Sequence, residues 1–172
     1  MPRFHGYVKE IGAKLDVRSM LEWVLPIPLA DWPTAPRPTL DPYIIGFPAI
    51  VNMPDWHGFA VEAAKLIEQI RRLDLIYLRG KKLYDFKIST LVPWQFLGTH
   101  EHGIGPDMHK WCFRAHVPIL TNPSAFFIMD QAYQMQEGSI YMVNVARPHA
   151  VVNHGETRRI HFMFEVDDQN DV

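Results

Sequence analysis

The sequence predicts a mainly β protein with helices in its N-terminal part, and two contrasting stretches lead to that prediction. Prolines crowd the stretch from Pro26 to Pro54, which should therefore run as an extended, mostly irregular connector. From about Leu83 onward, short runs rich in β-branched and aromatic residues are separated by turn signals. Breaks such as Thr121-Asn122-Pro123 and Glu137-Gly138 are typical of an antiparallel barrel or sandwich.

The length of the chain favours one domain. With 172 residues and 48% hydrophobic content, it can bury one sizeable core but hardly two. We therefore expect a single domain over residues 1–172, in which residues 1–80 form a helical and irregular cover and residues 83–166 form the β core.

Two helices are expected before the β core. Asp55 should cap a helix that runs to about Arg72, because apolar and charged residues recur there at helical spacing. The apolar positions are Phe59, Ala63, Ile67 and Ile70, and the charged ones are Glu62, Lys65 and Glu68. Upstream, Asp16 should cap a shorter helix that Pro26 ends.

Six strands are expected in the C-terminal half. They are Tyr84–Val92, Lys110–Leu120, Ala125–Met129, Ser139–Val145, His149–Val152 and Thr157–Val166.

Charge and composition exclude several classes of partner. A formal net charge of −2 supplies no basic surface, so we expect no nucleic-acid partner. The single cysteine, Cys112, excludes an intrachain disulfide framework and fits a reducing compartment. No apolar run approaches the roughly 20 residues that span a bilayer, and the N-terminus lacks the apolar centre of a signal peptide. We therefore expect no membrane partner and a cytoplasmic location.

The last two expected strands are joined by Asn153-His154-Gly155. If this is a three-residue loop with Gly155 in the left-handed conformation, pairing outward from it places His149 opposite Arg159. Opposed residues of an antiparallel pair project to the same face, so imidazole and guanidinium would be neighbours. A turn of two or four residues would separate them.

Two strands each place a histidine and an arginine on one face. In the final strand, Arg159, His161 and Glu165 alternate with apolar residues, with Met163 as the one exception. In the strand around His116, Arg114 shares its face. Such polar faces often meet solvent, but a barrel with a polar pocket inside and a helix outside would also produce this pattern.

The C-terminal half also carries a combination of motifs, in the segments RAHVPILTNPSAFF and EGSIYMVNVARPHAVVNHGETRRIHFMFEV. They contain an R-x-H strand, a glycine before a strand, an N-x-x-x-x-H strand end and an R-I-H strand after a short turn. In these features the stretch from about Leu83 to Val166 resembles the aspartyl/asparaginyl β-hydroxylase-like branch of the iron- and 2-oxoglutarate-dependent oxygenases. The resemblance implies a double-stranded β-helix, that is, a jelly-roll or cupin-like barrel, covered here by one or two helices.

The resemblance also implies a site. His116 and His149 would bind Fe(II), and Arg159 would pair with the C5 carboxylate of 2-oxoglutarate. Neutral imidazole is a good ligand for Fe(II), and a planar guanidinium can grip a carboxylate with two hydrogen bonds. Arg114 would contact the co-substrate as well, or else form a structural ion pair with an acidic neighbour.

The implied reaction is hydroxylation of an unactivated C–H bond with O2, in which 2-oxoglutarate is converted to succinate and CO2. The implied substrate is a small molecule or a peptide, with an amino acid or a peptide side chain as the family-level expectation. The commoner oxygenase signature has a carboxylate two positions after the first histidine, and here that position is Pro118. The branch is known for sites with two histidines only, and Asp130 is the candidate for a third ligand.

Two other readings remain open at this point. In a cupin metalloenzyme, an isomerase or dioxygenase that does not use 2-oxoglutarate, the ligands would be His100, His102, Asp107 and His149. In a barrel that binds a small carboxylate without chemistry, the arginine at position 159 would be kept and redox activity lost.

The same loop also admits a simpler interpretation. His100, His102 and His109 would line the mouth of the pocket with Trp94, or the loop would simply be exposed.

Overall fold

The protein is described here by a computed structural model, in which residues 6–12, 14–31, 56–101 and 113–167 are described. Its helices are α1 (Arg18–Val24), the 3-10 turn η1 (Leu29–Asp31) and α2 (Trp56–Arg72). Its strands are β1 (Val8–Gly12), β2 (Lys82–Leu91), β3 (Gln95–His100), β4 (Phe113–Leu120), β5 (Ala125–Ile128), β6 (Ala132–Tyr133), β7 (Ile140–Asn144), β8 (His149–Asn153) and β9 (Arg159–Asp167).

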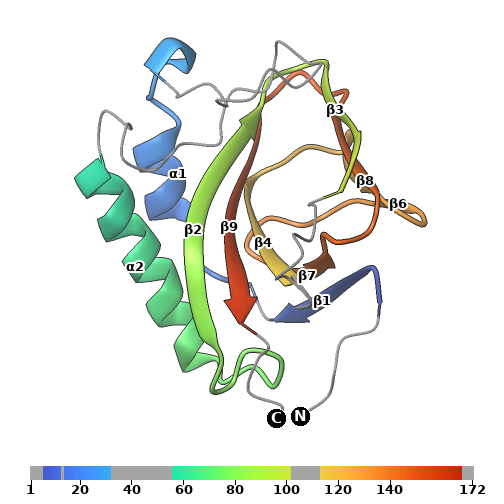
Figure 1. The fold of residues 1–172 in the computed structure, drawn as a ribbon. Helices are drawn as coiled ribbons and strands as arrows, with labels where there is room; N and C mark the ends of the chain where they lie inside the picture. The colour runs from blue at the N-terminus through green and yellow to red at the C-terminus, as the bar shows by residue number, and fades with distance from the viewer. Residues whose placement is uncertain (1–5, 13, 32–55, 102–112, 168–172) are drawn as a thin grey trace.

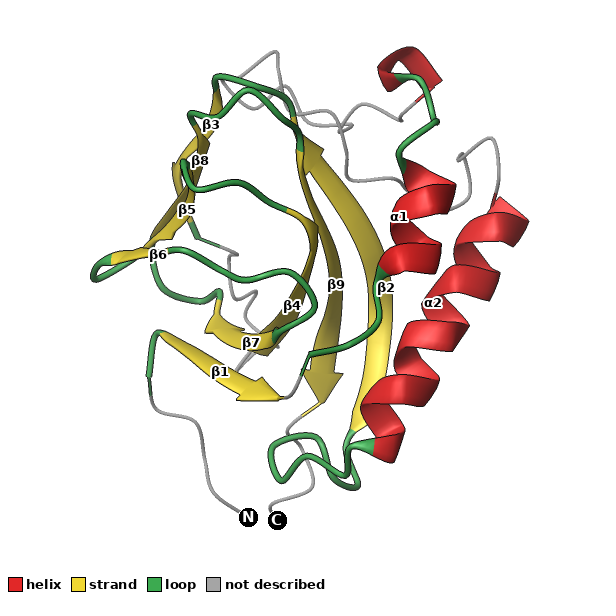
Figure 2. Ribbon diagram, turned by 180° about the vertical axis from the view of Figure 1, so that it is seen from behind, coloured by secondary structure: helices red, strands yellow, loops and turns green. Residues whose placement is uncertain are grey.

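The described strands form two antiparallel sheets that face one another (Figures 1 and 2). The five-stranded sheet has the order β1-β7-β4-β9-β2, and the four-stranded sheet has the order β3-β8-β5-β6. From β2 onward the chain alternates between the two sheets, apart from the short β5–β6 hairpin. This is the double-stranded β-helix, so the predicted fold class is confirmed.

The predicted last hairpin is wrong. β8 pairs with β3 and β5 in the four-stranded sheet, whereas β9 pairs with β2 and β4 in the other sheet. The residues between β8 and β9 therefore turn a corner between sheets, and His149 is not the cross-strand partner of Arg159. Gly155 is also not left-handed, since the positive-φ glycines of the described chain are Gly80 and Gly138.

The side chain of a buried asparagine stabilises the connection between β8 and β9. Asn153 is fully buried, and its amide nitrogen lies 3.1, 3.0 and 2.9 Å from the carbonyl oxygens of Leu91, Val92 and Thr157. Its amide oxygen accepts from Nδ2 of Asn122 at 2.9 Å. The side chain thus joins the end of β8 to the end of β2, which belongs to the opposite sheet.

Six predicted strands are present with slightly different ends, and three strands were not predicted. Residues 110–112 of the second predicted strand lie outside the described residues. The unpredicted strands are β1, β3 and β6. β1 shows that the expected N-terminal cover also contributes to the barrel, because its residues pair with β7. The five residues of β1 have no clear alternation of polar and apolar side chains. They form a strand because they pair with β7.

The helices cover the outer face of the five-stranded sheet (Figures 1 and 2). The ring of Phe59 in α2 lies 6.3 Å from that of Phe162 in β9 and 6.0 Å from that of Trp23 in α1. The apolar positions predicted from the helical spacing are largely buried, although Leu66 is buried more fully than Ile67, and the charged residue Glu62 is buried as well. The Asp55 cap lies outside the described residues.

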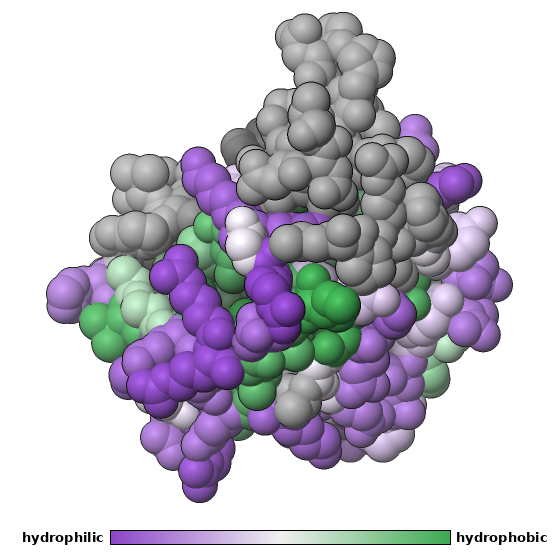
Figure 3. Space-filling view, turned by 90° about the horizontal axis from the view of Figure 1, so that it is seen from below, coloured by the Kyte–Doolittle hydropathy of each residue, from purple (hydrophilic) through white to green (hydrophobic). Residues whose placement is uncertain are grey.

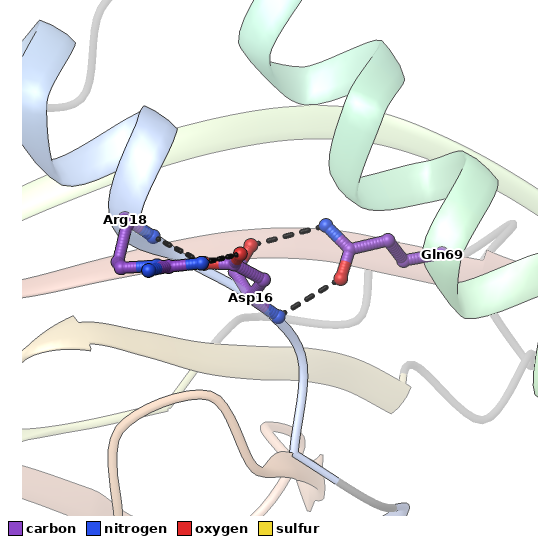
Figure 4. A network of polar contacts seen from close by, with 3 residues as sticks. All are labelled: Asp16, Arg18 and Gln69. Atoms are coloured by element: carbon purple, nitrogen blue, oxygen red, sulfur yellow. Dashed lines mark hydrogen bonds and ion pairs between the residues drawn. The ribbon is translucent and has the colours of Figure 1, made fainter.

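The start of α1 is fastened to α2 (Figure 4). The backbone N–H of Asp16 donates to Oε1 of Gln69 at 2.9 Å, and Nε2 of Gln69 donates back to the Asp16 carbonyl at 3.0 Å. The Asp16 carboxylate accepts from the backbone N–H of Arg18 at 3.1 Å, although the cap position itself is Val17. The prediction that Asp16 is the N-cap is therefore wrong by one position, although its carboxylate still accepts a hydrogen bond from the first residue of the helix.

The described surface is mixed in character. Seen from below, hydrophilic residues cover most of it, with hydrophobic ones between them (Figure 3). None of the described helices has the length and apolarity needed to cross a membrane.

Candidate functional site

The interior of the barrel is lined by the polar faces that the alternation predicted. In β9 the apolar residues Ile160, Phe162, Phe164 and Val166 belong to the core under the helices. The alternate residues therefore project between the two sheets. They are all buried, and with their neighbours in β4 they form the polar set Arg114, His116, Arg159, His161 and Glu165. The expectation of a polar interior with an apolar, helix-covered outside is confirmed.

The first predicted metal ligand, His116, lies in the middle of β4. Its register partner in β9 is Met163, which makes His161 its diagonal neighbour on the same face. The Nδ1 atoms of His116 and His161 lie 3.4 Å apart. The ring of Phe127 packs edge-on against His116, with a centroid separation of 5.3 Å.

The second predicted ligand, His149, begins β8 in the opposite sheet. Its Nδ1 lies 2.8 Å from the Arg147 carbonyl oxygen, which can only accept, so Nδ1 carries the proton and the lone pair is on Nε2. Burial, together with the charges of His100 and Arg114, lowers the pKa of His149 to about 4, even though the hydrogen bond to the Arg147 carbonyl acts to raise it. The imidazole is therefore neutral near pH 7, the form that binds metal.

The structure brings both predicted histidines against one side chain. Phe127 of β5 stacks on His149 at 5.2 Å with an angle of 13°, and it also contacts His116. The two imidazoles thus meet at the same phenyl ring although they belong to different sheets. A cross-sheet meeting of this kind replaces the cross-strand pair that the sequence led us to expect.

Arg159 is the buried cation of the site. It is 4% exposed, and none of the described acidic side chains forms an ion pair with it. Its Nη2 lies 3.1 Å from Nδ1 of His161. Burial lowers the pKa of Arg159 to about 9, so the guanidinium is still charged at neutral pH. A buried charge is costly unless it is paired, so this position demands an anion.

Arg114 differs from Arg159 because it has an acid beside it. Its Nε and Nη2 donate to Oε1 of Glu165 at 2.8 and 2.5 Å, and both side chains are buried. Of the two roles expected for Arg114, the structural ion pair is present. Its predicted contact with the co-substrate stays a prediction.

Asp130, the candidate for a third metal ligand, does not lie beside His116 and His149. Asp130 is exposed between β5 and β6, where the hydroxyl of Tyr133 donates to it at 2.7 Å, so it does not reach into the barrel. Pro118 is the register partner of His161 and therefore lies on the interior face where a triad would place its acid. Among the described residues, no cluster of three or more His, Cys, Asp or Glu side chains could hold an ion.

Only some of the metal ligands expected for a cupin metalloenzyme lie within the described residues. His102, Asp107 and His109 lie outside the described residues. His100 ends β3 as the register partner of His149, and their ring centroids are 4.2 Å apart. Its Nδ1 lies 2.8 Å from the carbonyl oxygen of Gly98, so this ring is held by the same kind of contact as that of His149.

Trp94 and His154 lie at the surface. Trp94 is 68% exposed in the turn between β2 and β3, and its ring stacks on that of His154 at 6.4 Å. The structure thus places His154 on the outside of the corner, away from the interior set.

The sequence did not predict two sets of contacts inside the barrel, those of His161 and that between His100 and His149. His161 was seen to lie on the polar face, but its contacts with both His116 and Arg159 were not foreseen. The repeated R-x-H spacing of residues 114–116 and 159–161 was the available signal. The contact of His100 with His149 depends on β3, and no local pattern indicated that strand.

Two solved structures resemble this chain in fold. One is a viral collagen prolyl hydroxylase from Paramecium bursaria Chlorella virus-1, solved as a 2-oxoglutarate complex, with 8% sequence identity and a TM-score of 0.55. The matched region covers 95% of this chain and 96% of the hydroxylase chain. A 2-oxoglutarate-Fe(II) oxygenase family oxidoreductase from Burkholderia pseudomallei is 11% identical over 69% of this chain, with a TM-score of 0.46. The chain spans 61% of that protein's length. The first of these similarities establishes the double-stranded β-helix fold.

The family is more specific than the fold. Residues 58–169 match the aspartyl/asparaginyl beta-hydroxylase family, and the chain belongs to that family. Membership supports a hydroxylase, that is, an oxidoreductase. No curated protein matches the sequence closely.

Proposed function

We propose that this protein is an Fe(II)- and 2-oxoglutarate-dependent hydroxylase that acts on a C–H bond of an amino acid or of a peptide side chain. The observation that carries the proposal is the buried guanidinium of Arg159, which has no acidic partner among the described residues and lies in the same interior as His116 and His149. A dicarboxylate co-substrate would supply the missing negative charge. Family membership supports the same assignment.

The residues present fit the metal. The proton on Nδ1 of His149 leaves the lone pair of Nε2 for coordination, and the backbone carbonyl that holds the ring is a common partner for a ligating imidazole. His116 and His149 would hold Fe(II), while the carboxylates of 2-oxoglutarate would complete the charge. Bound iron would supply the oxidising power for hydroxylation, and 2-oxoglutarate would leave as succinate and CO2.

The chain itself supplies binding, orientation and water exclusion. Arg159 would fix the far carboxylate of 2-oxoglutarate by two hydrogen bonds. The apolar interior cluster beside it includes Leu91, the register partner of Arg159, and Phe127. These side chains keep water from the charged groups and strengthen the contacts between them.

Anaerobic titration with Fe(II) tests the metal assignment. His116→Ala and His149→Ala should each abolish stoichiometric binding while circular dichroism shows an unchanged fold. His154→Ala is the matched control, because this histidine lies at the surface. His102→Ala should also bind normally. If His102 proves essential and His116 dispensable, the cupin reading replaces this one.

Turnover distinguishes an enzyme from a barrel that only binds a carboxylate. Amino acids and peptides would be screened with succinate formation as the readout, and His116→Ala would serve as the inactive control. Binding of 2-oxoglutarate without succinate from any substrate tested would favour the non-catalytic reading.

A further inference from the structure

We propose that His161 is a positioning residue that sets the tautomer of His116 and the orientation of Arg159 through one atom, its Nδ1. The inference rests on the proposed function, because it concerns how the metal ligand and the co-substrate arginine are held. Three interior side chains carry it, and all three are buried: Arg159, His161 and His116.

The direction of the hydrogen bonds follows from the chemistry of arginine. Nη2 of Arg159 lies 3.1 Å from Nδ1 of His161, and a guanidinium can only donate. Nδ1 of His161 must therefore be the acceptor, and the proton of this neutral imidazole must be on Nε2.

The tautomer of His116 follows in turn. The Nδ1 atoms of His116 and His161 lie 3.4 Å apart, and the His161 atom has no proton to give. A hydrogen bond between them therefore requires that His116 donates from Nδ1. The lone pair of His116 is then on Nε2, the arrangement that His149 reaches through the Arg147 carbonyl. The two proposed metal ligands thus adopt the same tautomer by different means.

The other edge of the His161 ring argues against a purely structural role. The residue is 1% exposed, and its Nε2 has no hydrogen-bond partner among the described residues. A buried polar atom without a partner is costly, so a histidine kept only for packing would be expected to satisfy both nitrogens or to be replaced by an apolar residue. What this side chain contributes is the lone pair on Nδ1, which the donors of Arg159 and His116 share.

The geometry also joins the two halves of the site. His161 is two positions from Arg159 on the same strand face and diagonal to His116 across the β4–β9 pair. A change at its Nδ1 therefore reaches the metal ligand and the co-substrate arginine together. Substitution of the residue that orients a metal-bound histidine typically weakens metal binding about 10- to 100-fold.

Three substitutions at position 161 distinguish the effect of the hydrogen-bond acceptor from the effect of side-chain volume. His161→Asn keeps an acceptor one bond beyond Cγ, where Nδ1 stands. His161→Gln carries its acceptor one bond further out, and His161→Leu has none. The inference expects His161→Asn to behave like the unsubstituted protein and the other two to fail in the same way.

The first measurement uses the metal-free protein and nitrogen-15 spectra of its histidine side chains. His116 should carry its proton on Nδ1 in the unsubstituted protein and in His161→Asn. In His161→Leu and His161→Gln this preference should be lost. A His116 proton on Nε2 in the unsubstituted protein would overturn the inference, whether or not the protein proves to be a hydroxylase.

The second measurement is calorimetric binding of Zn2+, as a redox-inert ion, and then of 2-oxoglutarate. His161→Leu and His161→Gln should lose about 10- to 100-fold in metal affinity and should also bind 2-oxoglutarate more weakly, with His161→Asn restoring both. If the unsubstituted protein binds neither, the proposed function fails. If it binds both and all three variants match it, only the role of His161 is refuted.

Discussion

Arg114 and Glu165 face one another across β4 and β9 and form an ion pair inside the barrel, with side chains that are 8% and 10% exposed. Arg159, on the same interior face, has no such acid beside it among the described residues. The two interior arginines therefore differ in kind. Arg114 is neutralised by Glu165, whereas none of the described acidic side chains neutralises Arg159.

Breaking the internal pair should destabilise the protein. Glu165→Leu should lower the free energy of unfolding by about 3–5 kcal/mol, because it leaves the Arg114 charge buried beside an apolar group. The double variant Arg114→Leu/Glu165→Leu should recover part of that loss. Chemical denaturation measures both. The exposed pair of Arg72 and Glu68 is the control, and its disruption should cost at most about 1 kcal/mol.

Arg159 should matter for binding rather than for folding. Arg159→Ala should weaken 2-oxoglutarate binding to the metal-loaded protein by about 2–5 kcal/mol, or roughly 30- to 5,000-fold. Arg159→Lys keeps the charge but loses the planar fork, so it should restore only part of the affinity. Calorimetry with a redox-inert ion measures the change, and an unaltered affinity in Arg159→Ala would remove this residue from the site.

Metal and 2-oxoglutarate should strengthen each other's binding. If His116 and His149 are the only protein ligands, the charge of Fe(II) is not offset by the chain, and the co-substrate carboxylate supplies the negative charge. Affinity for Fe(II) should rise when 2-oxoglutarate is present, and linkage requires the reverse by the same factor. A metal-bound structure with a protein carboxylate oxygen about 2.0–2.2 Å from the ion would contradict the two-histidine site.

Stability of the metal-free protein should fall in acid. Burial lowers the pKa of His149 from 6.5 to about 4, so between these values the unfolded chain binds the proton and the folded chain does not. Stability is therefore lost as pH falls from about 6.5 to about 4, by on the order of 3 kcal/mol for this one group. His161, whose pKa burial also lowers, contributes in the same direction.

A substitution at position 149 shows how much of this loss of stability in acid comes from His149. His149→Asn should flatten the decline of the unfolding free energy over this pH range, as denaturant titrations at several pH values would show. His154→Asn at the surface is the control. An equal decline in both variants would mean that His149 is not the group that titrates.

The corner between the sheets should depend on the amide of Asn153. Asn153→Asp replaces the donor with a carboxylate that faces three carbonyl oxygens, so it should destabilise the protein by more than the roughly 1–3 kcal/mol of an unsatisfied buried group. Asn153→Ala leaves the carbonyls unpaired without adding repulsion and should cost less. Thermal unfolding ranks the two, and the reverse order would show that Nδ2 is not the atom that matters.

The sequence alone determined which residues share a face. Side chains in a strand alternate with a period of two, so the R-x-H segments of β4 and β9 had to place Arg114 with His116 and Arg159 with His161. The apolar period of α2 marked the helix that covers the other face. Together with the motifs around His116 and His149, these local patterns also led to the correct family.

Only the tertiary structure decided which faces meet. Strand pairing depends on backbone partners far away in sequence, and no local period specifies them. For that reason β8 and β9 were wrongly joined into a hairpin, and His149 reaches the site from the opposite sheet. Whether a buried arginine is paired depends on what the fold places beside it, so Arg114 and Arg159 could be told apart only in three dimensions.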